Sequence, residues 1–111
     1  MGLKLKEGEY LELEFKAFNW AKWGKNLSGS WDRFYITNQR IVLKTPLIPI
    51  TQSIPWEDVY YMGRGEKGLR IEGKYKGFNL VLDINSKKLS EDTIFQFEQI
   101  ARSYKKFGKP I

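Results

Sequence analysis

The sequence contains no cysteine and no histidine among its 111 residues. Without cysteine there are no disulfides, thiolate nucleophiles or thiolate metal sites. Without histidine the chain lacks the usual general base near neutral pH and the commonest metal ligand. No apolar run approaches the ~20 residues of a membrane-spanning helix, and the first residues lack the apolar stretch of a signal peptide. We therefore expect a cytoplasmic, non-catalytic protein with no metal or other cofactor.

Positive charge and aromatic side chains are abundant instead. Lys and Arg number 19 against 13 Asp and Glu, and aromatic residues make up 15% of the chain, enough to build a packed core. The positive charge is concentrated in residues 16–44, where six basic residues face Asp32 alone, for a net charge of +5. Such an excess attracts phosphate, lipid headgroups or nucleic acid, or it is the solvated face of a basic protein.

Alternating apolar and polar residues predict β-strands over most of the chain. In residues 10–18, Leu11, Leu13 and Phe15 share one face while Glu12 and Glu14 share the other, which is typical of a half-buried strand. Further strands are predicted over residues 30–37, 40–44, 50–54, 59–62, 69–75 and 78–84. Asn38 lies in the two-residue connection between the second and third strands, which predicts a tight hairpin turn, and asparagine is able to take a positive φ there.

In the last segment the spacing of the apolar residues changes from two residues to three or four. Ile94, Phe97 and Ile100 recur at three-residue steps, which predicts an amphipathic helix over about residues 90–107. Ser90 is suited to the N-cap, and Gly108 to ending the helix. The chain therefore reads as one mainly β domain over residues 1–111, with strands over about residues 9–84.

One short motif has the spacing of a nucleotide-binding fingerprint. Residues 63–68 read GRGEKG, which matches G-x-G-x-x-G. That fingerprint binds a pyrophosphate at a strand-to-helix turn, whereas residues 69–75 alternate like a strand. We therefore predict a turn between two strands here, with glycines supplying positive φ, and no nucleotide site.

The stretch GSWDRFYITNQRIVL, followed by SIPWEDVYYM, resembles the GRAM domain and its bacterial relatives in the pleckstrin-homology-like (PH-like) superfamily. The motif positions are Gly29, Thr37, Asn38, Arg40, Ile54, Pro55, Trp56, Asp58 and Val59. The order of elements agrees over residues 8–107. The resemblance implies a PH-like barrel of about seven antiparallel strands in two near-orthogonal sheets, capped by one C-terminal α-helix. We expect Thr37, Asn38 and Arg40 to shape their hairpin and pin it to a neighbouring segment.

The resemblance implies binding and not catalysis, because family members bind lipid headgroups, peptides or other proteins, or assemble complexes. The phosphoinositide motif of pleckstrin-homology domains is incomplete here. Lys16 or Lys22 matches its first basic residue and Arg33 its last, but Trp31 stands where the middle basic residue belongs.

The connection between the first two predicted strands is unusual for a loop, because it holds Trp20, Trp23 and Trp31 with Lys22 and Lys25 among them. The tryptophans either cover the barrel as a lid or form a contact surface for a membrane or a protein. In the resembled fold this loop meets residues 46–49 and 74–76 at the open end of the barrel. The predicted site residues are Trp20, Lys22, Trp23, Lys25, Arg33, Lys74, Tyr75 and Lys76.

Two functions remain open. The first is a non-catalytic module recruited to an anionic membrane surface or a protein partner through the loop end of the barrel, which would place a cytoplasmic protein peripherally at the membrane. The alternative is a structural or homo-oligomerising subunit that uses the aromatic loop as its interface. Nucleic acid is not an expected partner, because the resemblance gives it no support. Glu12 and Glu14 read as solvated strand positions and not as a catalytic pair.

Overall fold

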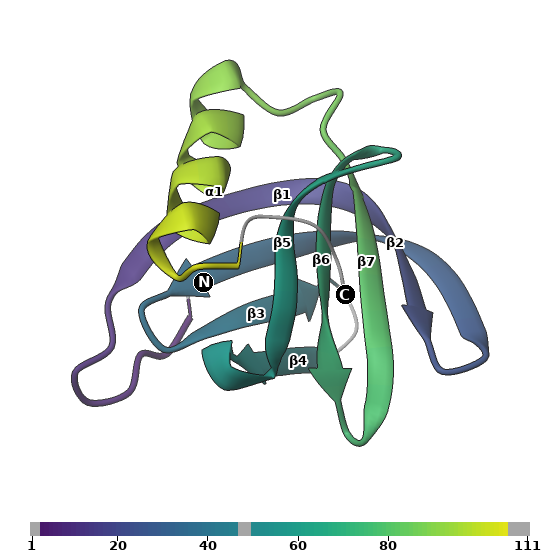
Figure 1. Ribbon diagram of the computed structural model, residues 1–111, viewed down its shortest axis with the longest axis horizontal. Helices are drawn as coiled ribbons and strands as arrows, with labels where there is room; N and C mark the ends of the chain where they lie inside the picture. The colour runs from purple at the N-terminus through teal and green to yellow at the C-terminus, as the bar shows by residue number, and fades with distance from the viewer. Residues whose placement is uncertain (1–2, 47–49, 107–111) are drawn as a thin grey trace.

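The computed structural model describes residues 3–46 and 50–106, and within them the chain is mainly β, as predicted. The elements are β1 (Leu11–Trp23), β2 (Asn26–Thr37), β3 (Arg40–Thr45), β4 (Ile50–Pro55), the short 3-10 turn η1 (Trp56–Asp58), β5 (Val59–Gly65), β6 (Gly68–Tyr75), β7 (Phe78–Asn85) and α1 (Glu91–Ser103). The strands form one antiparallel sheet in the order β4-β3-β2-β1-β7-β6-β5 (Figure 1).

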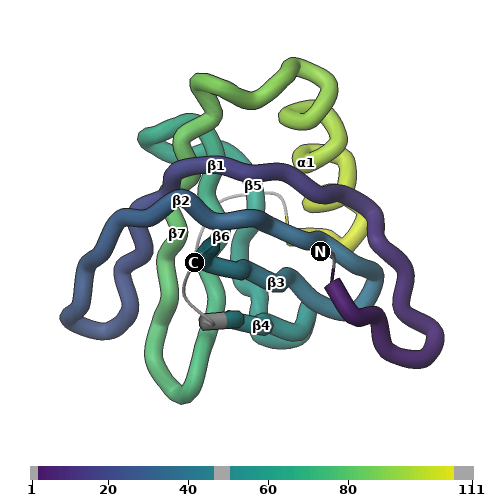
Figure 2. Tube along the Cα trace, turned by 180° about the vertical axis from the view of Figure 1, so that it is seen from behind, coloured from purple at the N-terminus to yellow at the C-terminus, as the bar shows by residue number. Residues whose placement is uncertain are grey.

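The sheet curls because β1 belongs to both of its halves. β1 pairs with β2 along its length but with β7 only from Asn19 to Trp23. Its first part therefore leaves β7 and follows β2. In Figure 1, β1 to β4 run across the view and β5 to β7 run up and down it, and Figure 2 shows the same crossing from behind. The two separate sheets implied by the resemblance are not confirmed, since the ladder is continuous through β1.

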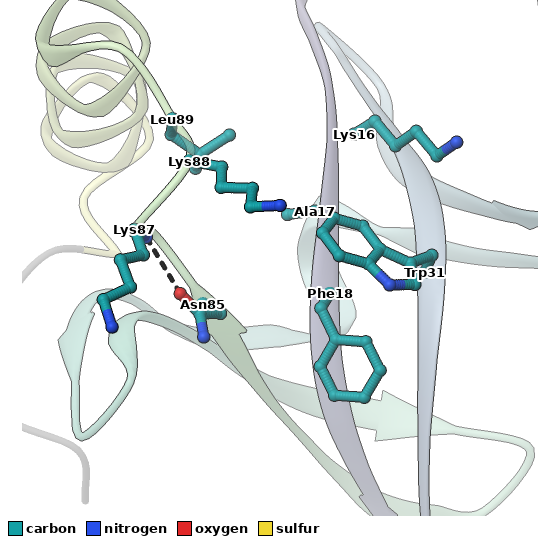
Figure 3. A pocket seen from close by; sticks show the side chains of 8 residues that line it. All are labelled: Lys16, Ala17, Phe18, Trp31, Asn85, Lys87, Lys88 and Leu89. Atoms are coloured by element: carbon teal, nitrogen blue, oxygen red, sulfur yellow. Dashed lines mark hydrogen bonds between the residues drawn. The ribbon is translucent and has the colours of Figure 1, made fainter.

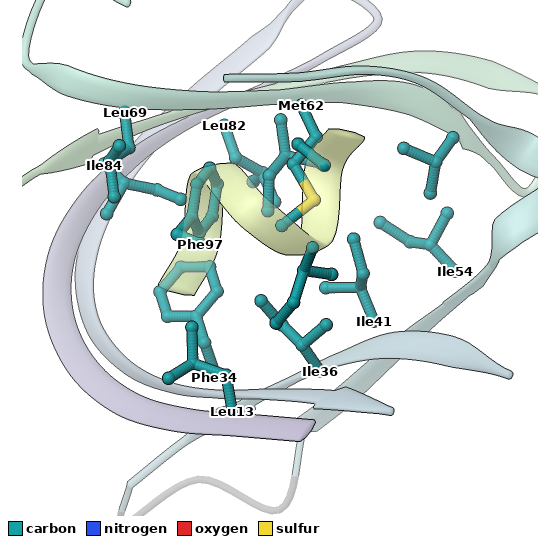
Figure 4. Close-up of a cluster of buried hydrophobic side chains, with 14 of the residues drawn as sticks. Leu13, Phe34, Ile36, Ile41, Ile54, Met62, Leu69, Leu82, Ile84 and Phe97 are labelled. Atoms are coloured by element: carbon teal, nitrogen blue, oxygen red, sulfur yellow. The ribbon is translucent and has the colours of Figure 1, made fainter. Parts of the chain in front are cut away.

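The helix fills the concave side of the curled sheet. Phe15 of β1 stacks on Phe34 of β2 with 4.9 Å between ring centroids. Phe97 of α1 packs edge-on against Phe15 at 6.2 Å. Figure 4 shows Phe97 projecting from the helix among the side chains of the sheet. Phe97, Ile100 and Ala101 are all buried, so one face of α1 completes the core.

The helix begins as predicted and ends earlier than predicted. Ser90 is the N-cap, and its Oγ accepts a hydrogen bond from the amide of Thr93. The helix stops at Ser103 because Lys105 adopts a left-handed φ of 59° and the amide of Lys106 bonds back to the carbonyl of Ala101 at 2.8 Å. This C-terminal hydrogen-bond pattern does not require glycine. The expected stop at Gly108 lies outside the described residues.

No helix begins at the GRGEKG stretch, as predicted, but the turn is shorter than predicted. Gly63 to Gly65 end β5, Gly68 begins β6, and only Glu66 and Lys67 lie between the two strands. Of its glycines, Gly68 has the left-handed backbone, with a φ of 128°, while Gly65 does not. A Cβ at Gly68 would lie 2.0 Å from Ser86 Oγ, so this position requires glycine for space as well as conformation.

The prediction that Thr37 and Arg40 pin their hairpin to a neighbour is confirmed. The neighbour is the segment before β1, whose Glu9 is buried. The Glu9 carboxylate accepts hydrogen bonds from Arg40 Nε at 2.8 Å, from Thr37 Oγ1 at 2.6 Å and from the amide of Lys6 at 2.8 Å. Buried charges need such full pairing, so residues well apart in the sequence are held as one unit.

Asn38 does not use its ability to adopt a positive φ. The turn closes differently, because Thr37 Oγ1 accepts hydrogen bonds from the amides of Gln39 and Arg40, each at 3.0 Å. The Asn38 side chain is thereby free to bind the N-terminal segment. It accepts from the amide of Tyr10 at 2.8 Å and donates to the carbonyl of Gly8 at 3.0 Å.

The role of α1 in the core predicts a contrast between two phenylalanines of the same helix. Phe97→Ala should lower the free energy of unfolding by about 3–5 kcal/mol, because a buried ring leaves a cavity. Phe95 is 59% exposed, so Phe95→Ala should change the free energy of unfolding by no more than about 0.5 kcal/mol. Chemical denaturation of both variants measures the difference. Equal losses would contradict the placement of Phe97 in the core.

The Glu9 pair predicts a specific loss of stability in acid. The hydrogen bond from Arg40 outweighs burial and lowers the pKa of Glu9 from 4.5 to about 2. A carboxyl whose pKa is lower in the folded state stabilises the fold above its unfolded pKa, and the stabilisation is lost as the pH falls through the folded pKa. The free energy of unfolding should therefore decrease between about pH 5 and pH 2, by roughly 3 kcal/mol from this group.

Glu9→Gln should be less stable than the wild type at neutral pH by about 3 kcal/mol, since Arg40 would lose its counter-ion. The free energy of unfolding of this variant should also decrease less than that of the wild type as the pH falls. Glu14 pairs with Arg33 in an exposed ion pair. Glu14→Gln is thus a matched control with an expected effect of about 0–1 kcal/mol. Denaturant titrations over a pH series compare the variants, and identical pH profiles for wild type and Glu9→Gln would contradict the assignment.

Candidate functional site

The tryptophan-rich segment is a β-hairpin and not the predicted loop. β1 continues to Trp23 and β2 begins at Asn26, so only Gly24 and Lys25 connect them. Gly24 has a φ of 60°, as expected at the first position of a two-residue hairpin turn.

The sequence did not predict this extension because Asn19 interrupts the apolar inner face of β1, and the β2 residues that pair with this face, from Asn26 to Asp32, are polar. The buried Asn19 side chain donates to Asp32 at 2.7 Å and to the carbonyl of Ser30 at 3.2 Å. This hydrogen bonding replaces apolar packing, so the hydrophobic alternation fades although the strands continue. The glycine turn flanked by aromatic residues was the available signal.

The β1–β2 and β6–β7 hairpins meet at their turns. Trp23 Nε1 donates to the carbonyl of Tyr75 at 2.8 Å, and the two rings lie 5.8 Å apart. The Trp23 ring also packs edge-on against Phe78 at 5.6 Å. The amide of Gly24 bonds to the carbonyl of Asn79 at 3.2 Å. We call residues 22–27 and 74–79 the hairpin tips, and they lie side by side in Figures 1 and 2.

The hairpin tips are positively charged. Lys22, Lys25, Lys74 and Lys76 are all exposed. Within the described residues, no ion pair joins any of them to a carboxylate. Residues 19–31 and 73–82 contain no Asp or Glu, so the tips carry a net charge of +4.

The carboxylates nearest the tips along β6 and β7 are already paired. Arg70 donates to Asp83 at 2.8 Å and contacts Glu72 at 3.5 Å. The hydrogen bond that Arg70 donates to Asp83, together with the negative charge of Asp83, raises the pKa of Arg70 further. These acids therefore leave the lysine charge of the tips uncompensated.

Two apolar side chains accompany the lysines. Leu27 is 66% exposed and Phe78 is 56% exposed. A hollow of 570 Å³ lies beside them, lined by Trp23, Gly24, Lys25, Asn26 and Phe78. Neither Leu27 nor Phe78 was among the predicted site residues. For Phe78 the signal was its place directly after the Lys76–Gly77 turn.

The predicted site residues thus fall into three places. The tips bring together Lys22, Trp23, Lys25, Lys74, Tyr75 and Lys76. Trp20 lies on the outer face of the sheet. Arg33 lies further along β2, where it pairs with Glu14 at 3.1 Å, so the structure does not bring it to the tips. Of the loop expected over residues 46–49 at the same end of the barrel, residues 47–49 lie outside the described residues.

The outer face around Trp20 is aromatic. Phe18 packs edge-on against Trp20 at 5.5 Å and against Trp31 at 5.7 Å. Trp20 and Trp31 are 41% and 45% exposed. A Cβ at Gly29 would lie 2.8 Å from the rings of Phe18 and Trp20, so glycine leaves them room to lie flat. Trp23, by contrast, packs against the core as the lid interpretation predicts.

Neither a metal site nor a spanning helix is present in residues 3–46 and 50–106. No three His, Cys, Asp or Glu side chains are grouped to hold a metal ion there. No helix in the same residues has the length and apolar character needed to cross a bilayer.

Comparison with known proteins gives a fold similarity without a family. No protein-family model and no curated protein matches the chain. A similar solved structure is the crystal structure of the C-terminal domain of an unknown protein from Leishmania infantum. The two are 16% identical with a TM-score of 0.57, over 90% of this chain and 88% of that chain. At this identity the similarity concerns the fold alone.

Proposed function

We propose that this chain is a non-catalytic binding module of the GRAM or PH-like type that attaches to anionic membrane surfaces through its hairpin tips. The observation that carries the proposal is the pairing of the two tips by Trp23, with four exposed lysines and the exposed side chains of Leu27 and Phe78. Lysines beside apolar side chains suit a headgroup region, where ammonium groups bind lipid phosphate and apolar groups enter the interface.

The seven strands and C-terminal helix support the GRAM or PH-like part of the proposal. In this view the two halves of the curled sheet, which share β1, correspond to the two near-orthogonal sheets of that fold. The proposed location is the cytoplasm, with peripheral attachment to the membrane.

The charge indicates weak and reversible attachment. Each lysine near an anionic surface contributes about 1 kcal/mol, so four contribute about 4 kcal/mol, equivalent to a Kd of about 1 mM. Leu27 and Phe78 add to this by inserting apolar surface. Attachment should therefore require anionic lipid and should weaken as salt screens the lysines.

Vesicle sedimentation tests the proposal directly. The wild type should bind vesicles of phosphatidylserine and phosphatidylcholine, and should not bind phosphatidylcholine alone. Lys25→Gln with Lys74→Gln removes two tip charges and should weaken binding roughly 30-fold, which corresponds to about 1 kcal/mol for each lysine.

The matched control removes the same charge elsewhere. Lys4 precedes β1, and Lys67 lies in the β5–β6 turn, at the other end of β6 from the tips (Figure 1). Lys4→Gln with Lys67→Gln should weaken vesicle binding less than about threefold, because neither lysine belongs to the hairpin tips and salt screens charges away from the bound surface. Equal effects of the two double variants would show general attraction of a basic protein and would overturn the assignment to the tips.

A second candidate function is self-association through the aromatic outer face. The exposed cluster of Phe18, Trp20 and Trp31 supports it, because aromatic side chains are frequent anchors of protein interfaces. This function needs the flat face of the sheet and makes no use of the tip lysines.

Light scattering after size-exclusion chromatography tests the second candidate. Self-association should give a concentration-dependent dimer that Trp20→Ser weakens at least about tenfold, since interface energy concentrates in aromatic anchors. The Lys25→Gln, Lys74→Gln variant should dimerise as the wild type does. A monomer at every concentration would remove this candidate.

A further inference from the structure

A cleft lies where β1 separates from β7, well away from the hairpin tips. β1 has no pairing with β7 before Asn19, and residues 85–89 bridge the resulting gap between β7 and α1. A pocket of 290 Å³ opens there, with Ala17, Phe18, Trp31 and Leu89 as its apolar lining and Lys16 and Lys88 among its polar residues (Figure 3).

A second hollow of 650 Å³ lies beside the first. It shares Lys16, Trp31 and Lys88 with the pocket, and adds Ser30 and Thr45. This second hollow exists because β2 pairs with β3 only from Arg33 onward, so the edge of β2 at Trp31 is uncovered. We refer to the two connected spaces as the Trp31 cleft.

Lys88 is held in place by the linker that carries it. The Asn85 side-chain oxygen accepts from the amide of Lys87 at 2.9 Å, and the amide of Leu89 bonds to the carbonyl of Ser86 at 3.0 Å. The linker is therefore an ordered turn. Figure 3 shows the Lys88 side chain extending from it toward Trp31, and its Nζ lies 5.7 Å from the centre of the Trp31 ring.

The charge of the Trp31 cleft is not compensated by nearby acids. Within the described residues no ion pair joins Lys16 or Lys88 to a carboxylate. Asp32 is close in sequence but buried, and its oxygens accept from Asn19, Ser30 and Thr45. The neighbouring Glu14 is paired with Arg33. The cleft therefore combines an apolar wall with two lysines that have no anionic partner.

We propose that the Trp31 cleft binds a small amphipathic anion, an alkyl or aryl phosphate, sulfate or carboxylate taken up as a free molecule. Its apolar part packs against Phe18, Trp31 and Leu89. Its anionic group pairs with the Lys88 ammonium group over Trp31, and Lys16 adds positive charge to the same lining. Concave, mostly apolar sites with a few polar groups at fixed positions are typical of small-molecule binding.

The proposed cleft is independent of the membrane attachment proposed above. Lys16 and Trp23 are seven residues apart on β1, which is about 23 Å along an extended strand at ~3.3 Å per residue. The cleft therefore lies beyond the headgroups that the hairpin tips would contact. Binding at either place neither requires nor excludes binding at the other.

Titration calorimetry with octyl phosphate, octyl glucoside and inorganic phosphate tests the proposal on the full chain. Octyl phosphate, below its micelle concentration, should bind one to one and at least about tenfold more tightly than either other compound. Octyl glucoside has the alkyl chain of octyl phosphate but no charge, and inorganic phosphate has the charge but no alkyl chain. An affinity for octyl glucoside or for inorganic phosphate similar to that for octyl phosphate, or no saturable binding of octyl phosphate, would overturn the proposal.

Variants locate the binding site. Lys16→Gln with Lys88→Gln should weaken octyl phosphate binding at least about tenfold while the melting temperature stays that of the wild type, because both side chains are exposed. Lys25→Gln with Lys74→Gln, at the hairpin tips, should leave octyl phosphate binding unchanged. Weaker binding in the hairpin-tip variant, with unchanged binding in the cleft variant, would show that octyl phosphate binds at the tips and would overturn the cleft assignment.

The same variants separate a free amphiphile from a bilayer lipid. Lys16→Gln with Lys88→Gln should sediment with phosphatidylserine vesicles as the wild type does. Loss of vesicle binding in this variant would assign the cleft to a lipid within the bilayer and overturn the proposal of a free ligand. Failure of the wild type to bind vesicles, with octyl phosphate binding intact, would remove only the membrane function.

Discussion

The buried ion pair between Glu9 and Arg40 is the interaction on which closure of the fold depends. Its carboxylate also holds Thr37, and the carbonyl of Thr37 accepts a 2.8 Å hydrogen bond from Trp56 Nε1. Trp56 in turn stacks on Tyr104 with 4.1 Å between ring centroids. One continuous set of contacts therefore links the segment before β1, the β2–β3 turn, η1 and the end of α1. These contacts stabilise the curl of the sheet, because they join the end of the helix and the end of the edge strand β4 to the same buried ion pair.

Much of the fold is visible in the sequence because its signals are local. The predicted strands over residues 69–75 and 78–84 agree with β6 and β7 to within one residue. Ser90 marks the true start of α1. Thr37 and Arg40 were correctly expected to pin their hairpin, although the sequence did not show that Glu9 is their partner. The errors arise where a distant contact replaces a local signal, as at the end of α1, where backbone hydrogen bonds end the helix before any glycine.

The candidate site was only partly visible for the same reason. The turn lysines were predictable because turns expose their side chains, whereas the packing of Trp23 between Tyr75 and Phe78 depends on how the two hairpins cross. Nor could the sequence reveal that Lys88 lies over Trp31, since these residues meet only after β1 separates from β7. The length of β1 was hidden because hydrogen bonds, and not apolar packing, hold its inner face around Asn19.

A sheet that curls without closing retains two edge strands, here β4 and β5. The edge of β5 is partly covered by the chain that leaves α1, because the amide of Met62 donates to the carbonyl of Lys106 at 3.1 Å. Unpaired edge strands invite pairing with strands of other molecules and lead to aggregation. The residues that follow the helix therefore also shield part of this edge from pairing with a strand of another molecule.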